Sequence, residues 1–253
     1  MSKFVDRLQN LSKSLTSAMG FHPTVYEPKG SAMLLIAGLS GTDVKEAKIV
    51  ADVKADAGLI LNQSFNTKIA GQMIETLGDV PLGLFVKDMN GDNVNKLGDL
   101  GYDFLVLDTK MPATMLNGKG MGKFLMVVPS LDQGLVRAVN SLDVDGVFLS
   151  CSEDSFITVE QLLIYQRFNE LLDKPLIVML PSLVNNDVIS NLWEARVSGV
   201  VIPAGQSSEA LTELRKVMDN LPKKAKHRKT KASPVLPYYG DAISIEGEGE
   251  EEI

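Results

Sequence analysis

The chain has 253 residues, of which 45% are hydrophobic and 23% are charged, with 25 Lys and Arg against 32 Asp and Glu. These proportions are typical of one mid-sized globular domain, and they exclude a collagen-like, a wholly disordered or a disulfide-stapled chain. Residues 221–253 hold equal numbers of basic and acidic residues, so the net charge of −7 lies in residues 1–220. A surface of that sign repels phosphate, which argues against nonspecific binding of nucleic acid by the globular part.

The cysteine content and the apolar runs predict the cellular compartment of the protein. Cys151 is the one cysteine and cannot form an intramolecular disulfide, which predicts a reducing compartment and therefore a cytoplasmic protein. The apolar runs are shorter than the ~20 residues of a membrane-spanning helix, and the polar N-terminus does not resemble a signal peptide. Glu153 and Asp154 beside Cys151 disfavour a reactive thiolate, so we interpret this residue as an inert thiol.

The first predicted element is a helix over residues 4–15, whose apolar residues share one face. It is expected to close one end of the domain or to pack along its side; a dimer contact or a membrane-surface helix are the alternatives. Eight short, almost continuous apolar runs follow, separated by segments with helical periodicity, as expected for parallel strands buried on both faces. The runs cover residues 33–38, 57–62, 82–87, 103–108, 124–129, 145–150, 176–181 and 199–204.

Eight strand-and-helix units predict a (β/α)8 barrel of the TIM type over residues 31–220. Residues 1–30 would form an N-terminal helix with its lead-in, and residues 221–253 a flexible tail, basic first and then acidic. An open, doubly wound sheet is the alternative, but the loop after the first run lacks the Gly-rich turn of dinucleotide-binding sheets.

The fourth unit of the predicted barrel is irregular. Only residues 109–123 separate the fourth and fifth runs, which leaves room for about two helical turns after Pro112. The glycines of this segment lead into a strand, so they are expected at the N-terminal face of the barrel, away from the end where barrel enzymes carry out their chemistry.

The residues directly after each strand would form the functional rim of such a barrel. His22 and His227 are the two histidines of the chain and lie outside the eight units, so the rim offers no histidine base or metal ligand. Lysine and carboxylate chemistry remains: Lys87 ends the third run, and Asp108 and Lys110 end the fourth. Together they could provide a general acid, a Schiff-base lysine or a static ion-pair network.

Two stretches here resemble known enzyme families. Residues 80–108, VPLGLFVKDMNGDNVNKLGDLGYDFLVLD, resemble the third-strand region of indole-3-glycerol phosphate synthases, which implies that Lys87 is a general acid. The sequence LDTK is similar to the start of the Asp-x-Lys-x-x-Asp motif of orotidine monophosphate decarboxylases, which maps onto Asp108 and Lys110. The first-strand Glu and Lys of the synthases are absent, and the second Asp of the decarboxylases falls on Ala113. The resemblance therefore implies an aldolase-type, phosphate-binding barrel with incomplete catalytic motifs.

Barrels of this kind commonly hold phosphate with the loops after strands seven and eight and with a helix N-terminus. The corresponding phosphate-binding candidates are Ser182, Gly205, Ser207 and Ser208. Ser207 or Ser208 is also a good N-cap for the last helix, and Glu209 in its first turn would weaken anion binding. No cofactor and no metal site is predicted.

The tail joins a basic run, a Pro and Tyr segment and an acidic end, and it is expected either to be solvated or to be a recognition arm. As a recognition arm it would bind RNA, anionic lipid, an acidic protein or another copy of the chain. Its partner-binding candidates are Lys223, Lys224, Lys226, Arg228, Lys229, Lys231, Tyr238 and Tyr239.

Two functions stay open at this point, and with them the question of catalysis. In the first, the barrel has a degenerate or absent active site and acts as an interaction or assembly module. In the second, it is a metal-independent lyase or isomerase that acts on a small phosphorylated or carboxylated metabolite through Lys87, Asp108 and Lys110.

Overall fold

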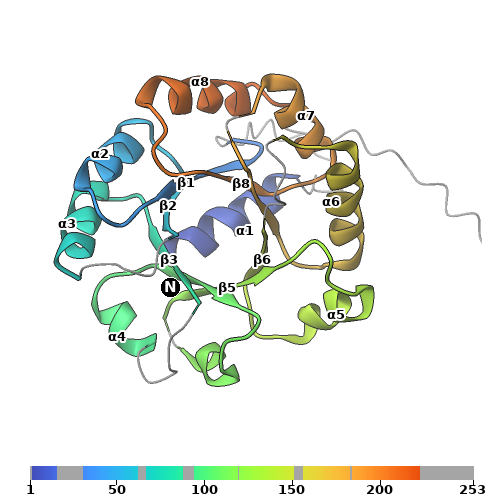
Figure 1. Ribbon diagram of the computed structural model, residues 1–253, viewed down its shortest axis with the longest axis horizontal. Coiled ribbons are helices and arrows are strands. Elements are labelled where there is room, and N and C mark those ends of the chain that lie inside the picture. The colour runs from blue at the N-terminus through green and yellow to red at the C-terminus, as the bar shows by residue number, and fades with distance from the viewer. Residues whose placement is uncertain are drawn as a thin grey trace, which may run out of the picture.

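Eight parallel strands close into a barrel in a computed structural model that describes residues 2–15, 31–61, 67–87, 94–118, 120–150, 156–182 and 184–222 (Figure 1). Each strand pairs with the next one in the sequence, and the eighth pairs with the first. The strands are β1 (Leu34–Leu39), β2 (Ala57–Ile60), β3 (Leu82–Val86), β4 (Phe104–Asp108), β5 (Gly122–Val127), β6 (Gly146–Leu149), β7 (Leu176–Met179) and β8 (Gly199–Ile202). The predicted (β/α)8 barrel is confirmed, with each strand inside or within two residues of its predicted run.

Helices surround the barrel and cover the outward-facing side chains of its strands, which forms the larger of two hydrophobic cores (Figure 1). The connection between β4 and β5 differs, because its short sequence forms only the 3-10 turn η2 instead of an α-helix. The elements are α2 (Val44–Asp52), α3 (Thr67–Leu77), α4 (Val94–Asp99), η2 (Ala113–Asn117), α5 (Gln133–Ala138), η3 (Val139–Ser141), α6 (Val159–Leu171), α7 (Asn186–Glu194) and α8 (Ser208–Asp219).

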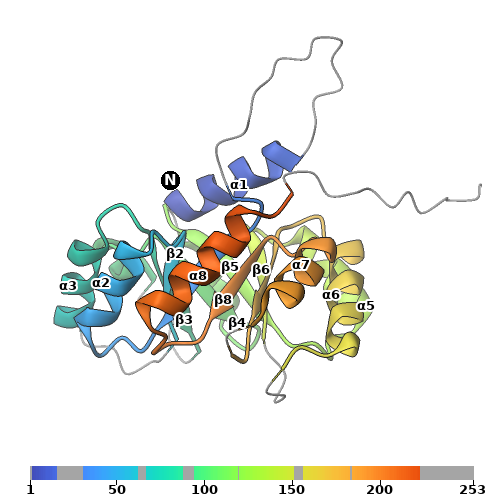
Figure 2. The same cartoon turned by 90° about the horizontal axis from the view of Figure 1, so that it is seen from above.

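The N-terminal helix α1 (Lys3–Leu15) lies across the N-terminal end of the barrel (Figure 2). Its Phe4 is fully buried, stacks on Phe104 with ring centroids 4.3 Å apart, and lies 5.3 Å from the ring of Phe124. Leu8 joins the same second core, which fills the inside of the barrel. The prediction that this helix closes an end of the domain is confirmed.

Two local features hold α1 in this position. The carboxylate of Asp103, which precedes β4, accepts hydrogen bonds from the Ser2 hydroxyl and from the backbone N–H groups of Lys3 and Phe4. These bonds satisfy donors at the start of the helix that have no partner within it. Gly83 leaves the space for the Phe104 ring, because a Cβ there would lie 2.3 Å from it. The N-terminal end of the barrel is therefore sealed, and a site has to lie at the opposite rim or on the flank.

Candidate functional site

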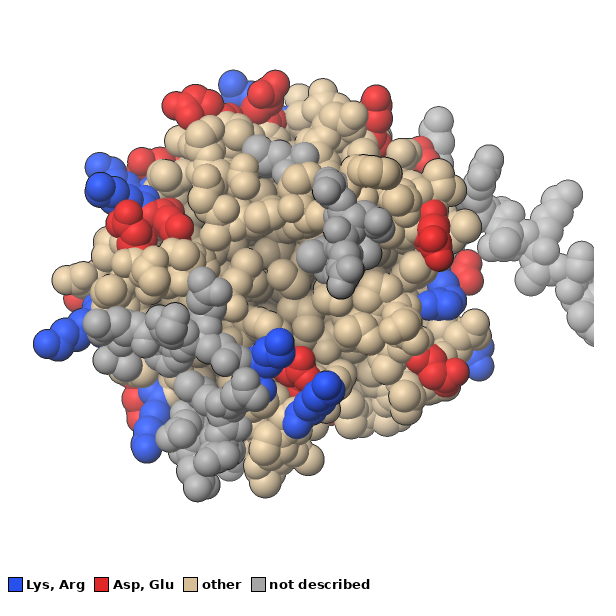
Figure 3. All heavy atoms as spheres, viewed as in Figure 1, with Lys and Arg blue, Asp and Glu red and all other residues tan. Residues whose placement is uncertain are grey.

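Figure 3 looks onto the rim at the carboxyl ends of the strands, opposite α1. Its described surface is mostly uncharged, with a hollow near the centre and one small group of basic and acidic residues beside it. Leu61, Phe85 and Met179 are partly buried and pack onto the aromatic core inside the barrel. The described part of the mouth therefore has an apolar floor.

The predicted lysine and carboxylate residues lie at two neighbouring strand ends. Val86 of β3 pairs with Leu107 of β4, so Lys87 and Asp108, the next residue on each strand, follow side by side. Lys87 and Lys110 are exposed, and Asp108 is half-buried. The Oδ1 atom of Asp108 accepts a hydrogen bond of 2.8 Å from the backbone N–H of Lys110. This bond is typical of an Asx turn, so Asp108 has a structural role in the turn that leaves β4.

The phosphate-binding candidates follow β7 and β8, which are neighbours in the barrel. Ser207 is the N-cap of α8, as predicted: its side chain accepts a hydrogen bond from the backbone N–H of Ala210. Ser208 begins that helix, Gly205 is exposed at a φ of +81°, and Ser182 is half-buried after β7. The hydroxyl of Ser207 therefore already serves the helix start at which a phosphate would bind.

A small crevice of about 170 Å³ lies beside these candidates, between the ends of β1 and β8. Asp43 and Glu46 line it, and the Oε2 atom of Glu46 accepts hydrogen bonds from both the backbone N–H and the hydroxyl of Ser40. A carboxylate thus takes two donors that an anionic ligand would otherwise use. Lys45 also lines the crevice, so its charged lining consists of two carboxylates and one ammonium group, and the excess of negative charge disfavours a phosphate group.

Several other predictions concern residues that the structure does not describe. The tail candidates from Lys223 to Tyr239 lie outside the described residues, and so does Cys151. Within the described ranges, no three His, Cys, Asp or Glu side chains gather closely enough to hold a metal ion. Of the helices in those ranges, none has the length and apolar character needed to cross a membrane.

A groove that the sequence did not reveal lies on the flank of the barrel, between η2 and α5. It lies where η2 stands in place of an α-helix, and its lining includes the buried side chains of Leu107 on β4 and Leu125 on β5. Its volume is about 390 Å³, and its lining is apolar except for Asp108 and Thr109. We call it the flank groove. Its volume falls within the range of about 300 to 1,000 Å³ that is common for ligand pockets.

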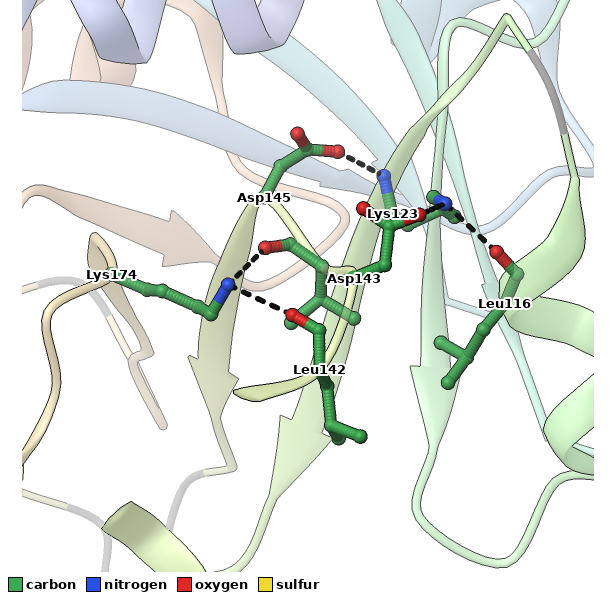
Figure 4. A network of polar contacts seen from close by, with 7 residues as sticks. Leu116, Lys123, Leu142, Asp143, Asp145 and Lys174 are labelled. Carbon is green, nitrogen blue, oxygen red and sulfur yellow. Dashed lines mark hydrogen bonds and ion pairs between the residues drawn. The ribbon is translucent and has the colours of Figure 1, made fainter. Parts of the chain in front are cut away.

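Polar contacts at the start of β5 and β6 hold the two walls of the flank groove together (Figure 4). The ammonium group of Lys123 donates to the carbonyl of Leu116, on the η2 wall, and to the carboxylate of Asp143, which follows Leu142 on the other wall. Lys174 donates from the other side to the carbonyl of Leu142. Lys123 thus bridges the two walls through non-covalent contacts, and it is almost buried, with 13% of its side chain exposed.

The ion pair between Lys123 and Asp143 predicts a pH dependence of stability. The hydrogen bond from Lys123 and its positive charge lower the pKa of Asp143 in the folded chain. The stabilisation is therefore present above the usual Asp pKa of about 3.9 and is lost as the pH falls through the lowered value. Because the Asp143 side chain is 90% exposed, the effect is expected to be small. We expect Asp143→Asn to be slightly less stable than the parent near neutral pH, with a difference that shrinks as the pH falls through the lowered pKa, in denaturant unfolding over that range. A difference that is the same at every pH would contradict this role.

Exposed apolar side chains concentrate in one stretch of the sequence, and two of them, Leu135 and Leu142, line the flank groove. Of the seven large hydrophobic residues that are exposed among the described residues, all but Leu100 lie between residues 128 and 163. These six are Val128, Leu135, Leu142, Phe156, Val159 and Leu163. We call Phe156, Val159 and Leu163 the α6 stripe, and the six residues with the flank groove the α5–α6 face.

Val159 and Leu163 lie four residues apart at the start of α6, so they share one side of the helix, and Phe156 precedes the helix and its N-cap Thr158. Val159 is 75% exposed and Leu163 is 61% exposed, whereas Tyr165 and Phe168 of the same helix are buried against the barrel. One sequence signal could have revealed this face: apolar residues occur on more than one side of α6, which a helix with a single buried face does not need.

Comparison with known proteins defines the class of the chain. No protein-family model and no curated protein matches it. Among solved structures, thiamine phosphate pyrophosphorylase from Pyrococcus furiosus is 14% identical, with a TM-score of 0.59 over 74% of this chain and 95% of that one. Phosphoribosyl anthranilate isomerase from Thermus thermophilus is 12% identical, with a TM-score of 0.59 over 73% and 98%.

A third similar structure is the carboxyl transferase domain of Rhizobium etli pyruvate carboxylase, 7% identical, with a TM-score of 0.56 over 74% of this chain and 47% of that one. At such identities the likeness shows the fold alone. The chain has the (β/α)8-barrel fold, and the remote resemblance to aldolase-type barrels is confirmed at the level of the fold.

Proposed function

We propose that this chain is an interaction or assembly module with a degenerate or absent active site, and that it binds its partner through the α5–α6 face. The observation that carries the proposal is that, among the described residues, six of the seven exposed large hydrophobic side chains lie between residues 128 and 163, and two of them line an apolar groove. Apolar surface in water is unfavourable by about 25 cal/mol per Å². A contiguous exposed patch is therefore typical of a surface that a partner covers.

The contacts at the rim support the same proposal, because they give its polar groups structural roles. Asp108 accepts from the backbone of Lys110, Ser207 caps α8, and Glu46 accepts from Ser40. Each of these contacts is accounted for by a turn or a helix start, so none of them by itself requires a substrate. The missing first-strand Glu and Lys of the synthases point in the same direction.

A second candidate function is favoured by the pairing of β3 with β4. That register brings Lys87 beside Asp108 at the apolar mouth of the barrel, with Lys110 two residues further on. Such a group could carry out lyase or isomerase chemistry on a small phosphorylated or carboxylated metabolite, with Lys87 as the acid. The names of two structural neighbours contain phosphate or phosphoribosyl, which fits a ligand of this kind.

A thermal-shift screen separates the two functions. Small phosphates and carboxylates at about 10 mM are added to the parent, to Lys87→Ala and to Lys48→Ala, a matched control on α2, because a ligand that binds the folded state raises Tm. If the chain is an interaction module, we expect that no anion raises the Tm of the parent while failing to raise the Tm of Lys87→Ala. A rise that is lost in Lys87→Ala and kept in Lys48→Ala would contradict the proposal and favour the enzyme.

A further inference from the structure

We infer that Asn117, at the end of η2, is a site of spontaneous covalent modification, at which the side-chain amide is lost as ammonia and a carboxylate takes its place. The modification needs no partner and no ligand, so it goes beyond the proposed function and is tested independently of it. Three features of the molecule point to it: the residue that follows Asn117, the hydrogen bonding of the two reacting groups, and the contact that holds the preceding residue.

The residue that follows Asn117 is a glycine. In the deamidation of asparagine the attacking atom is the backbone nitrogen of the next residue, and a glycine has no side chain to hinder its approach. Glycine also gives the backbone more freedom to reach the geometry of attack. Asn117–Gly118 is the one Asn–Gly pair within the described ranges, and the pair Asn90–Gly91 lies outside them.

Both reacting groups lack hydrogen-bond partners in the described part of the chain. The backbone N–H of Gly118, the C-cap of η2, has no acceptor there in hydrogen-bonding geometry. By contrast, the N–H groups of the C-cap residues Val53, Leu172 and Ala195 each donate to a carbonyl of their own helix. Asn117 is exposed, and its side-chain amide makes no hydrogen bond to a described residue. The attacking nitrogen and the amide that it attacks are therefore both accessible.

Asn140 has the opposite arrangement and provides an internal comparison. Its amide nitrogen donates to the carbonyl of Leu171 at 2.9 Å, and its amide oxygen accepts from the backbone N–H of Asp173 at 3.0 Å. Both hydrogen bonds have to break before the side chain can turn toward the backbone, which adds to the activation free energy. The folded structure therefore protects Asn140 and leaves Asn117 reactive.

The reaction balances with water as its one co-reactant. The Gly118 nitrogen gives up its proton and bonds to the Cγ carbon of Asn117, while the bond from Cγ to the amide nitrogen breaks. That nitrogen takes up a proton and leaves as ammonia, so a cyclic imide remains. Water then adds to either carbonyl of the ring and opens it, which gives aspartate or isoaspartate. Both products carry a carboxylate, and isoaspartate also has an additional carbon atom in the main chain.

The modified residue adjoins the contact that holds the η2 wall of the flank groove. The ammonium group of Lys123 donates to the carbonyl of Leu116, the residue before Asn117, at 2.8 Å (Figure 4). Only residues 118–121 connect Asn117 to the start of β5, so a longer main chain has little room to relax. We expect isoaspartate to displace the Leu116 carbonyl from Lys123 and to loosen this wall.

Peptide mapping by mass spectrometry tests the site on the full chain, incubated in its folded state and then digested at acidic pH. We expect Asn117 to deamidate at least about 100-fold faster than Asn140. The rate is expected to rise with hydroxide concentration, because the attacking nitrogen has to lose its proton. Equal rates at the two residues would overturn the inference.

Gly118→Ser separates the effect of structure from that of sequence, because Asn117 and Asn140 are then both followed by serine. The φ of −56° and ψ of 136° at Gly118 suit a residue with a side chain. We expect the rate at Asn117 to fall about tenfold and to stay at least about tenfold above that at Asn140. In urea, where both residues are exposed, the two rates are expected to converge. Equal rates in the folded variant would contradict the role of the structure.

Hydrogen exchange tests the effect on the groove wall. The isoaspartyl form is separated from the parent by ion exchange, and Asn117→Asp is the matched control with the new charge but without the longer main chain. We expect the amides of η2 and of the start of β5 to exchange at least about tenfold faster in the isoaspartyl form than in the parent and the control. Unchanged exchange in the isoaspartyl form would overturn the effect on the wall.

Discussion

Replacement of Phe4 by alanine is expected to lower the free energy of unfolding by about 3 to 5 kcal/mol, the usual cost of removing a fully buried aromatic ring. Phe4 has no exposed surface and contacts the rings of Phe104 and Phe124 inside the barrel. Its removal leaves a cavity at the point where α1 enters the barrel, and the aromatic neighbours on the strands cannot collapse into that space.

Urea unfolding of the full chain measures this loss, and Leu100→Ala is the matched control. Leu100 is 38% exposed, so its truncation is expected to cost less than about 1 kcal/mol. An effect of Phe4→Ala no larger than the control would mean that α1 is not part of the core. The N-terminal end of the barrel would then be open, and binding would no longer be restricted to the opposite rim or the flank.

Gly83→Ala is expected to lower the free energy of unfolding by about 3 kcal/mol, at the upper end of the range for overpacking a core. A Cβ at this position would lie 2.3 Å from two carbon atoms of the Phe104 ring, well inside van der Waals contact. The ring cannot move aside, because Phe4 stacks on it and Phe124 meets it edge-on with centroids 5.6 Å apart. The strand or the ring stack has to shift instead.

A double-mutant cycle identifies the cause of that loss. Phe104→Leu removes the ring that meets the new methyl group, so Gly83→Ala is expected to cost at least about 1 kcal/mol less in the Phe104→Leu background than in the parent. Gly71→Ala is the control, because a Cβ on that helix position meets nothing within 4 Å and is expected to stabilise slightly. Additive losses would show that the steric contact is not the reason.

The fold could be predicted from sequence because the strands of a closed parallel barrel are buried on both faces. Each of them is therefore an apolar run that stands out from the helical segments around it. The apolar face of α1 and the cap at Ser207 were equally readable, since helical spacing and a capping residue are local signals. The fourth unit was also predicted to be irregular, with room for only about two helical turns after Pro112, and the 3-10 turn η2 lies there.

The candidate site was harder to predict from the sequence than the fold. Sequence order predicts that Lys87 and Asp108 lie on neighbouring strands, but it does not show that the Asp108 carboxylate accepts from the backbone of Lys110. The flank groove depends on how η2 and α5 pack over Leu107 and Leu125, which the sequence does not show. Likewise, the periodicity of α6 shows that Leu163 is apolar, but only the packed structure shows that nothing in the described chain covers it.

Radical footprinting of the chain inside the cells that produce it tests the central claim most directly, because it reports which side chains are covered in the working state. In the structure of the single chain, Phe156 is 67% exposed and Leu163 is 61% exposed. We predict that both side chains are protected in cells. The reaction rate of each, divided by its exposed fraction, is then much lower than the same ratio for the control Leu100. Reaction of Phe156 and Leu163 at the rates that their exposure dictates would contradict an interaction module at this face.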